Sequence, residues 1–368
     1  MYDQLREETL YIMLYAVVIT IAMLASCYLL FRRANAIAPN VTPPVRLRRW
    51  TGAFFAVFVV NHVWYMWPMF FLHSNDDVLL TNLIGGVIDS MTFFPLSIIV
   101  LLVMLQDRRR PLWPVAVMVS PLIVGMVWRI VGSSKTMIPL LIVYLLLMSV
   151  GLIIYMVRSL RQYGRWLRDN YADLEHKEVW QSFVVLAIIL LVFAIYTLTN
   201  GDQNYEYLLQ VVVIVLISYL LWRVETLSDL SLLQPQALPA DERAIEVTED
   251  DLPAVRDNIG ELLQQHCVDA RLYLQHDLTV AQLAQAVGVN RLYLSQYFSR
   301  QGLSYNAYIN DLRINHFVSL YREAIAAQRS FTAQQLAHDS GYQSYSTFSL
   351  AFKQRMGQSV TAWMRNAD

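Results

Sequence analysis

The residues best suited to chemistry lie near the C-terminus, on the outward faces of two short amphipathic stretches. Apolar stripes at a spacing of four, Leu294 with Phe298 and Phe348 with Phe352, predict two helices that each bury one face. The opposite faces carry hydroxyls, amides and cations together with two leucines: Arg291, Leu292, Ser295, Gln296, Ser299 and Arg300 on the first helix, and Tyr345, Ser346, Ser349, Leu350 and Lys353 on the second. Such groups form hydrogen bonds and ion pairs with base edges and phosphates. We therefore expect these residues to contact DNA.

An internal repeat positions the two helices. The segment "LAQAVG" at residues 283–288 recurs as "LAHDSG" at 336–341, and "GLSYNAY" at 302–308 recurs as "GQSVTAW" at 357–363. In each copy a helix ending in Leu-Ala precedes a glycine, which turns the chain without a Cβ clash, and a second helix follows. The repeat predicts a duplicated helix-turn-helix, with a first copy at residues 283–308 and a second at 336–363.

Residues 271–365 resemble the DNA-binding domain of the AraC/XylS family. The resemblance is carried by the duplicated Leu-Ala-x(3)-Gly, by Tyr-Leu-Ser at 293–295, by Arg313-Ile314, by Gly341 before an aromatic residue, by Phe352-Lys353 and by Gly357. It implies two helix-turn-helix motifs joined by a long helix, with both recognition helices entering successive major-groove segments on one face of double-stranded promoter DNA.

The charge of this region is nearly balanced. Residues 261–368 carry nine Lys and Arg against seven Asp and Glu, and Gln296 and Leu350 stand where the family often has arginine. A small surplus of cations predicts weak binding of DNA by a monomer, so we expect a homodimer, membrane confinement or contact with RNA polymerase to raise occupancy. For Arg313, between the copies, two roles stay open: a structural ion pair or a phosphate contact.

The first two-thirds of the chain are apolar. The sequence is 56% hydrophobic and 15% charged, and its mean hydropathy is +0.38, outside the range of soluble domains. Seven runs approach or exceed the ~20 residues that cross a bilayer as a helix: 10–31, 51–72, 79–106, 111–128, 136–157, 179–200 and 207–222. The predicted fold is all-α, a seven-helix membrane domain at 1–224, a helix extension and acidic linker at 225–256, and the AraC-type domain at 257–368.

Loop charges predict the orientation. Thirteen Lys and Arg lie in the loops after the first, third and fifth runs, against three on the other side. Because positive loops stay inside, the N-terminus is expected outside and the C-terminal domain in the cytoplasm. With the family resemblance, this predicts a multi-pass protein of a bacterial inner membrane.

Polar residues inside the apolar runs are costly and so indicate a function. The candidate residues, polar ones together with their aromatic neighbours, lie at the middle or outer level of the bilayer: Asn61, His62, Trp64, Tyr65, Asp89 and Arg129. One interpretation is an Asp89–Arg129 ion pair that holds two helices together, beside an aromatic belt. The other is an outward-facing pocket for a small signal molecule.

No sequence motif indicates an enzyme. The apolar runs contain neither H-E-x-x-H nor G-x-S-x-G, the seventh has no lysine for a Schiff base, and Cys27 and Cys267 lack metal-ligand spacing. We expect no catalytic residue, no metal and no cofactor. The leading hypothesis is a membrane-anchored transcription regulator whose seventh helix runs on to transmit a signal. The alternative is a transporter-like or sensory membrane protein whose tail binds protein rather than DNA.

Overall fold

The computed structural model describes residues 2–71, 75–132, 137–185, 187–188, 203–233 and 252–367. Within these ranges the regular elements are helices, and a single isolated bridge pairs Tyr171 with Thr279, so the all-α prediction is confirmed there. Contacts divide the chain into two compact units. The apolar unit comprises Met1–Tyr163 and Val179–Asp229, and the helix-turn-helix unit comprises Gly164–Glu178 and Leu230–Asp368.

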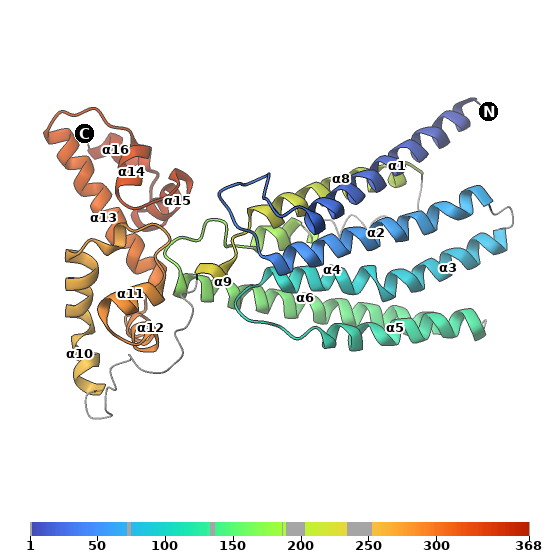
Figure 1. The fold of residues 1–368 in the computed structure, drawn as a ribbon, viewed down its shortest axis with the longest axis horizontal. Helices are drawn as coiled ribbons and strands as arrows, with labels where there is room; N and C mark the ends of the chain where they lie inside the picture. The colour runs from blue at the N-terminus through green and yellow to red at the C-terminus, as the bar shows by residue number, and fades with distance from the viewer. Residues whose placement is uncertain are drawn as a thin grey trace. The chain divides into compact units, whose positions relative to one another are not determined.

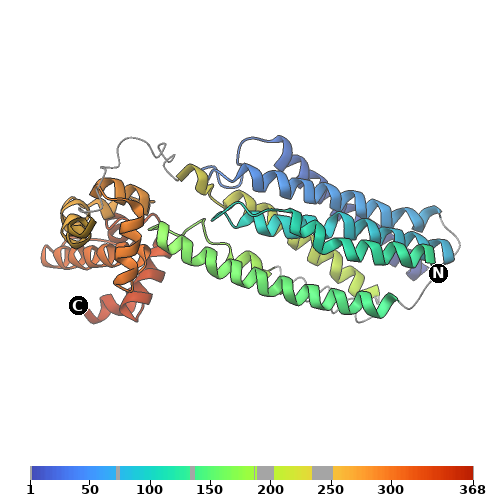
Figure 2. The same ribbon diagram turned by 90° about the horizontal axis from the view of Figure 1, so that it is seen from below.

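The apolar unit is a bundle of long helices. Their bounds are α1 Tyr2–Phe31, α2 Val45–Phe71, α3 Asn75–Met91, α4 Phe93–Met104, α5 Trp113–Gly132, α6 Met137–Asn170, whose last residues count with the other unit, and α8 Gln203–Thr226. Helices α1, α2 and α8 pack side by side, as do α3 and α5 (Figures 1 and 2). Thr92 separates α3 from α4, so the expected third run consists of two helices.

Among the described residues, four helical stretches are long and apolar enough to cross a membrane: Thr9–Phe31, Ile84–Met104, Pro139–Asn170 and Tyr207–Thr226. They match the first, third, fifth and seventh predicted runs. Helix α2 is polar at its start and middle, and the apolar part of α5, Trp113–Trp128, is short. Most of the sixth run lies outside the described residues. Seven spans were expected, and the described residues therefore support four.

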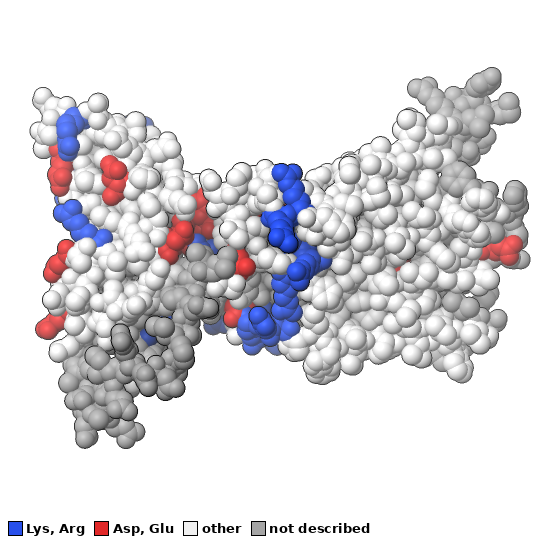
Figure 3. Space-filling view, viewed as in Figure 1, with Lys and Arg blue, Asp and Glu red and all other residues white. Residues whose placement is uncertain are grey.

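Cations form a band on the apolar unit. Figure 3 shows Lys and Arg gathered in one zone of this unit, while most of the remaining described surface in that view carries no charge. The exposed arginines near the ends of α1, α2 and α4 are Arg32, Arg33, Arg46, Arg49, Arg108 and Arg109. A single cationic band beside an uncharged surface is the pattern expected of a helix bundle that meets lipid.

The C-terminal end of α8 is anchored within the apolar unit. The carboxylate of Glu225, which is fully buried, lies 2.9 Å from Arg48 Nε and accepts a hydrogen bond from the Tyr28 hydroxyl. Near it, Asp229 N donates to Thr42 O, so this N–H is not available for a further hydrogen bond within the helix. Helix α8 therefore ends at Thr226 and a short α9, Leu230–Leu233, follows, so the expected run-on of the seventh helix is not found. Residues 234–251 of the predicted acidic linker lie outside the described residues.

The helix-turn-helix unit contains short helices around one long one. They are α10 Leu252–Leu263, α11 Val280–Val287, α12 Arg291–Arg300, α13 Tyr305–Ala326, α14 Ala333–Asp339, α15 Tyr345–Met356 and α16 Val360–Ala367, with a π-helical turn at Gln264–Asp269 and a 3₁₀ turn at Leu272–Leu274. Helix α13 is the long connection that the family resemblance implies. Side-chain caps begin α11 at Thr279, α13 at Ser304 and α14 at Thr332.

Each copy has its own hydrophobic core. The first core packs Leu283, Leu294 and Phe298 with the start of α13, and it also buries Ala172. The second core is aromatic: Phe317, Phe348 and Phe352 form ring contacts at 4.5 to 5.7 Å, and Trp363 of α16 closes it. Burial of each apolar side chain contributes roughly 1.5–3 kcal/mol, so these cores dominate the stability of the unit.

Arg313 joins the two copies. Its guanidinium donates to Tyr273 O at 2.8 Å and to Gln275 O at 2.7 Å, and it lies over the ring of Tyr342. The residue is 1% exposed, which excludes a phosphate contact in this conformation. Of the two roles predicted for it, the structural one is correct, but its partners are carbonyls and a ring rather than a carboxylate.

Candidate nucleic-acid interface

The recognition helices α12 and α15 are fixed by caps on one side and by burial on the other. Asn290 accepts from Leu292 N at the start of α12, and Ser344 accepts from Thr347 N at the start of α15. The predicted inward stripes are buried, with Leu294 and Phe348 each 0% exposed. Because these stripes lock the rotation of each helix, the polar faces point outward.

The predicted DNA-contacting residues lie on those outward faces. On α12 the exposed residues are Arg291, Leu292, Gln296, Ser299 and Arg300, and Ser295 is partly buried. On α15 the exposed residues are Ser346, Leu350 and Lys353. Tyr345 and Ser349 are partly buried, and Tyr345 packs against the second core. The arrangement presents donors, acceptors and cations to a groove, and contact of each residue with DNA stays a prediction.

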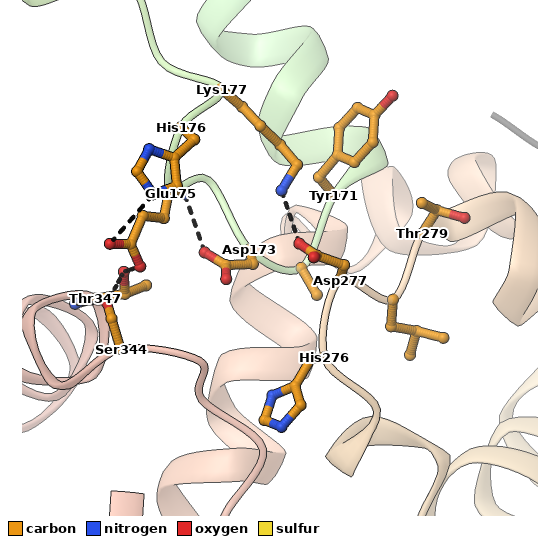
Figure 4. A network of polar contacts seen from close by, with 12 residues as sticks. Tyr171, Asp173, Glu175, His176, Lys177, His276, Asp277, Thr279, Ser344 and Thr347 are labelled. Carbon is orange, nitrogen blue, oxygen red and sulfur yellow. Dashed lines mark hydrogen bonds and ion pairs between the residues drawn. The ribbon is translucent and has the colours of Figure 1, made fainter. Parts of the chain in front are cut away.

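Two residues of the recognition helices already have partners within the unit. The Arg291 guanidinium donates to Asn170 Oδ1. The Thr347 hydroxyl donates to Glu175 Oε2 at 3.0 Å, as Figure 4 shows. Asn170 and Glu175 lie between the fifth and sixth predicted runs, 136–157 and 179–200. These partners are 121 and 172 residues apart in the chain, and no motif or periodicity in the sequence indicates that they meet.

Burial shifts the pKa values of several groups in the helix-turn-helix unit. Desolvation lowers the pKa of the Arg313 guanidinium and raises the pKa of the Asp173 carboxyl. It also raises the pKa of the Cys267 thiol to about 11, so this buried thiol stays protonated near neutral pH. Among the described residues, no group of three or more His, Cys, Asp or Glu has a geometry that could hold a metal ion.

In the apolar unit, part of the predicted pocket comes together around Asp89. Asn61 Nδ2 donates to Asp89 Oδ1 at 2.6 Å, and the Tyr65 hydroxyl donates to Asp89 Oδ2 at 2.7 Å. His62 instead packs between the rings of Phe58 and Tyr15.

Of the other two predicted pocket residues, the structure describes the side chain of Trp64. Trp64 Nε1 donates to Thr81 O, away from Asp89. The Arg129 side chain lies outside the described residues, and with it the expected Asp89–Arg129 ion pair. Asn61 and Tyr65, one helical turn apart on α2, thus supply the described partners of the carboxylate.

Comparison with known proteins identifies the region that carries this interface. Residues 283–366 match the family model of a helix-turn-helix domain of the AraC type. Searches of curated proteins and of solved structures gave no match. The matched residues begin in α11 and end in α16, and so include both recognition helices. Residues 283–366 are thus an AraC-type helix-turn-helix domain, which supports a DNA-binding regulator.

Proposed function

We propose that this protein is a membrane-anchored transcription regulator that binds promoter DNA sequence-specifically and couples a signal at or in a bacterial inner membrane to that binding. Helices of the apolar unit anchor the chain and sense the signal, and the helix-turn-helix unit binds the duplex from the cytoplasmic side. A homodimer, or contact with RNA polymerase, compensates for the small surplus of cations in the unit.

The observation that carries the proposal is the pair of recognition helices with equivalent outward polar faces. Both α12 and α15 bury an aromatic or aliphatic stripe and expose polar or cationic side chains, and α13 holds them in one unit. Two such helices can enter two successive major-groove segments, which doubles the number of base contacts available to one chain. The match of residues 283–366 to a DNA-binding family supports the same reading.

Membrane anchoring is supported separately. The four apolar helical stretches and the cationic band both fit a bundle whose arginine-rich end faces the cytoplasm. The Asn61–Asp89–Tyr65 cluster is the part of the proposed signal site that the structure assembles. A small polar molecule that competes for Asp89 would change the packing of α2 against α3.

Genome-wide mapping of DNA crosslinked to the intact protein tests the proposal. We expect the parent protein to enrich a small set of promoters, and Lys353→Ala and Ser346→Ala to lower that enrichment. Arg329→Ala is the matched control, since Arg329 is exposed in the loop between α13 and α14, away from both recognition helices, and its removal should leave the map unchanged. The absence of enriched promoters for every form, with a stable protein recovered in the membrane, would favour the alternative that the tail binds protein.

A further inference from the structure

The last residue of α6 and the segment that follows it pack on both copies of the helix-turn-helix unit. We call residues 170–177 the strap. Ala172 N donates to Leu278 O at 3.0 Å, and Asn306 Nδ2 of α13 donates to Ala172 O at 2.6 Å. Lys177 Nζ lies 2.9 Å from Asp277 Oδ1, and both Ala172 and Lys177 are 2% exposed. The hydrogen bonds, the ion pair and the burial together show that the strap packs specifically on the helix-turn-helix unit.

The two strap side chains that reach the recognition helices are suited to compete with DNA. Glu175 brings a carboxylate to the first turn of α15, where the free backbone N–H groups and the helix dipole favour an anion such as a phosphate. Asn170 takes the guanidinium of Arg291, the first residue of α12, whose N-terminal turn is the part of a recognition helix that contacts base edges. Each recognition helix thus has one side chain of its first turn bonded to the strap.

From these contacts we propose that the strap is an autoinhibitory element: it occupies the DNA-binding surface at the N-terminal turns of α12 and α15, and DNA must displace it. The inference rests on the proposed function, which it extends by naming how that site is regulated. It also names a route for the signal. Asn170 is at once the last residue of the membrane-helix candidate Pro139–Asn170 and the partner of Arg291.

The test uses the full chain in lipid nanodiscs and a labelled duplex of its gene's own upstream region, with unrelated duplex as competitor. Glu175→Gln keeps the shape of the side chain but removes its charge, and Asn170→Ala removes the acceptor for Arg291. We expect each to bind the duplex about fivefold more tightly than the parent, because the Thr347 hydroxyl loses a charged acceptor in the first variant and the Arg291 guanidinium loses its acceptor in the second. Asp169→Asn is the matched control, since it removes one negative charge beside the strap from an exposed side chain, and it should change the affinity less than twofold.

A second measurement separates this inference from the proposed function. Hydrogen exchange of the full chain should show faster exchange of the 171–177 amides when the duplex is added, and in Glu175→Gln without it. The amides of α13 report that each variant remains folded. Duplex binding by the parent with no change in strap exchange, or weaker binding by either variant, would overturn autoinhibition while the proposed function stands. Failure of every form to bind any duplex, with strap exchange accelerated in Glu175→Gln, would overturn the proposed function and the competition with it.

Discussion

The two helix-turn-helix copies use equivalent caps but complete their cores from different parts of the chain. Thr279 and Thr332 cap the first helix of each copy, and Asn290 and Ser344 cap the two recognition helices. The second core is closed by Trp363 of α16, close in sequence to α15. The first core buries Ala172, which lies more than a hundred residues earlier. The comparison shows that one sequence repeat can produce a self-contained half and a half that depends on a distant segment.

This difference gives the copies different exposure to a signal. A movement of the strap changes the packing of the first core directly through Ala172, and it reaches the second copy through the Glu175–Thr347 hydrogen bond. The Arg313 guanidinium also links the two copies, because it donates to carbonyls of the first half and lies over the ring of Tyr342 in the second. We expect the first copy to respond to the membrane more directly than the second, whose described contact with the strap is the Glu175–Thr347 hydrogen bond.

The largest expected effect comes from Phe348→Ala in the second core. Phe348 is 0% exposed and contacts Phe317, Phe352 and Tyr342, so its removal leaves a cavity that costs about 4 kcal/mol in the free energy of unfolding. Hydrogen exchange of the full chain measures the result by region. Protection should fall in α14 and α15 and remain in α11 and α12. Equal loss in both copies would show that the second core is not self-contained.

A smaller and more informative effect separates the equivalent turn glycines Gly288 and Gly341. Both have positive φ, +75° and +94°, so alanine costs about 1–2 kcal/mol at either from backbone strain alone. At Gly341 an added Cβ would also lie 2.9 Å from Leu274 Cα, whereas nothing lies within 4 Å at Gly288. Gly341→Ala should therefore lower the midpoint of thermal unfolding of the unit clearly more than Gly288→Ala. Equal midpoints would mean that the two halves do not touch at this turn.

The two helix-turn-helix copies can be predicted from local sequence patterns. Contacts between residues far apart in the chain cannot. The i, i+4 stripes, the turn glycines and the spacing of the copies predict both recognition helices and their outward faces, because such patterns record which side of a helix is buried. The strap escapes prediction because Asn170 and Glu175 are ordinary polar residues in a loop between apolar runs. The end of α8 is equally hidden, since the sequence past Trp222 indicates that the helix continues, and only the hydrogen bond from Asp229 N to Thr42 O, next to the buried Arg48–Glu225 pair, shows why it stops.

Lowering the pH should strengthen the packing of the strap on the helix-turn-helix unit, because Asp173 becomes protonated. Burial raises the pKa of this carboxyl above the usual 3.8, opposed by the Glu175 N–H and by Lys177 and reinforced by Asp277 and Glu175. Because the pKa is raised in the folded state, the stabilising contribution is fully present below 3.8 and is lost as the pH rises through the folded value. Protection of the 171–177 amides, corrected for intrinsic exchange, should therefore increase from pH 7 toward pH 4. In Asp173→Asn the 171–177 amides should be better protected at pH 7, and their protection should no longer depend on pH. If the pH dependence persists in this variant, another group causes it.

The smallest expected effect compares one cation from each recognition helix. Lys353 has an exposed side chain on α15, and its replacement by alanine should lower the affinity for DNA at every sequence and reduce the slope of log affinity against log salt by about 1. Arg291 must first leave Asn170 to meet DNA, so Arg291→Ala should reduce affinity less than Lys353→Ala in the parent background. In the Asn170→Ala background that competition is absent, and the two losses should become similar. Titration of the full chain at several salt concentrations measures both quantities. An equal loss from Arg291→Ala in the two backgrounds would mean that Asn170 orients Arg291 for DNA instead of holding it back.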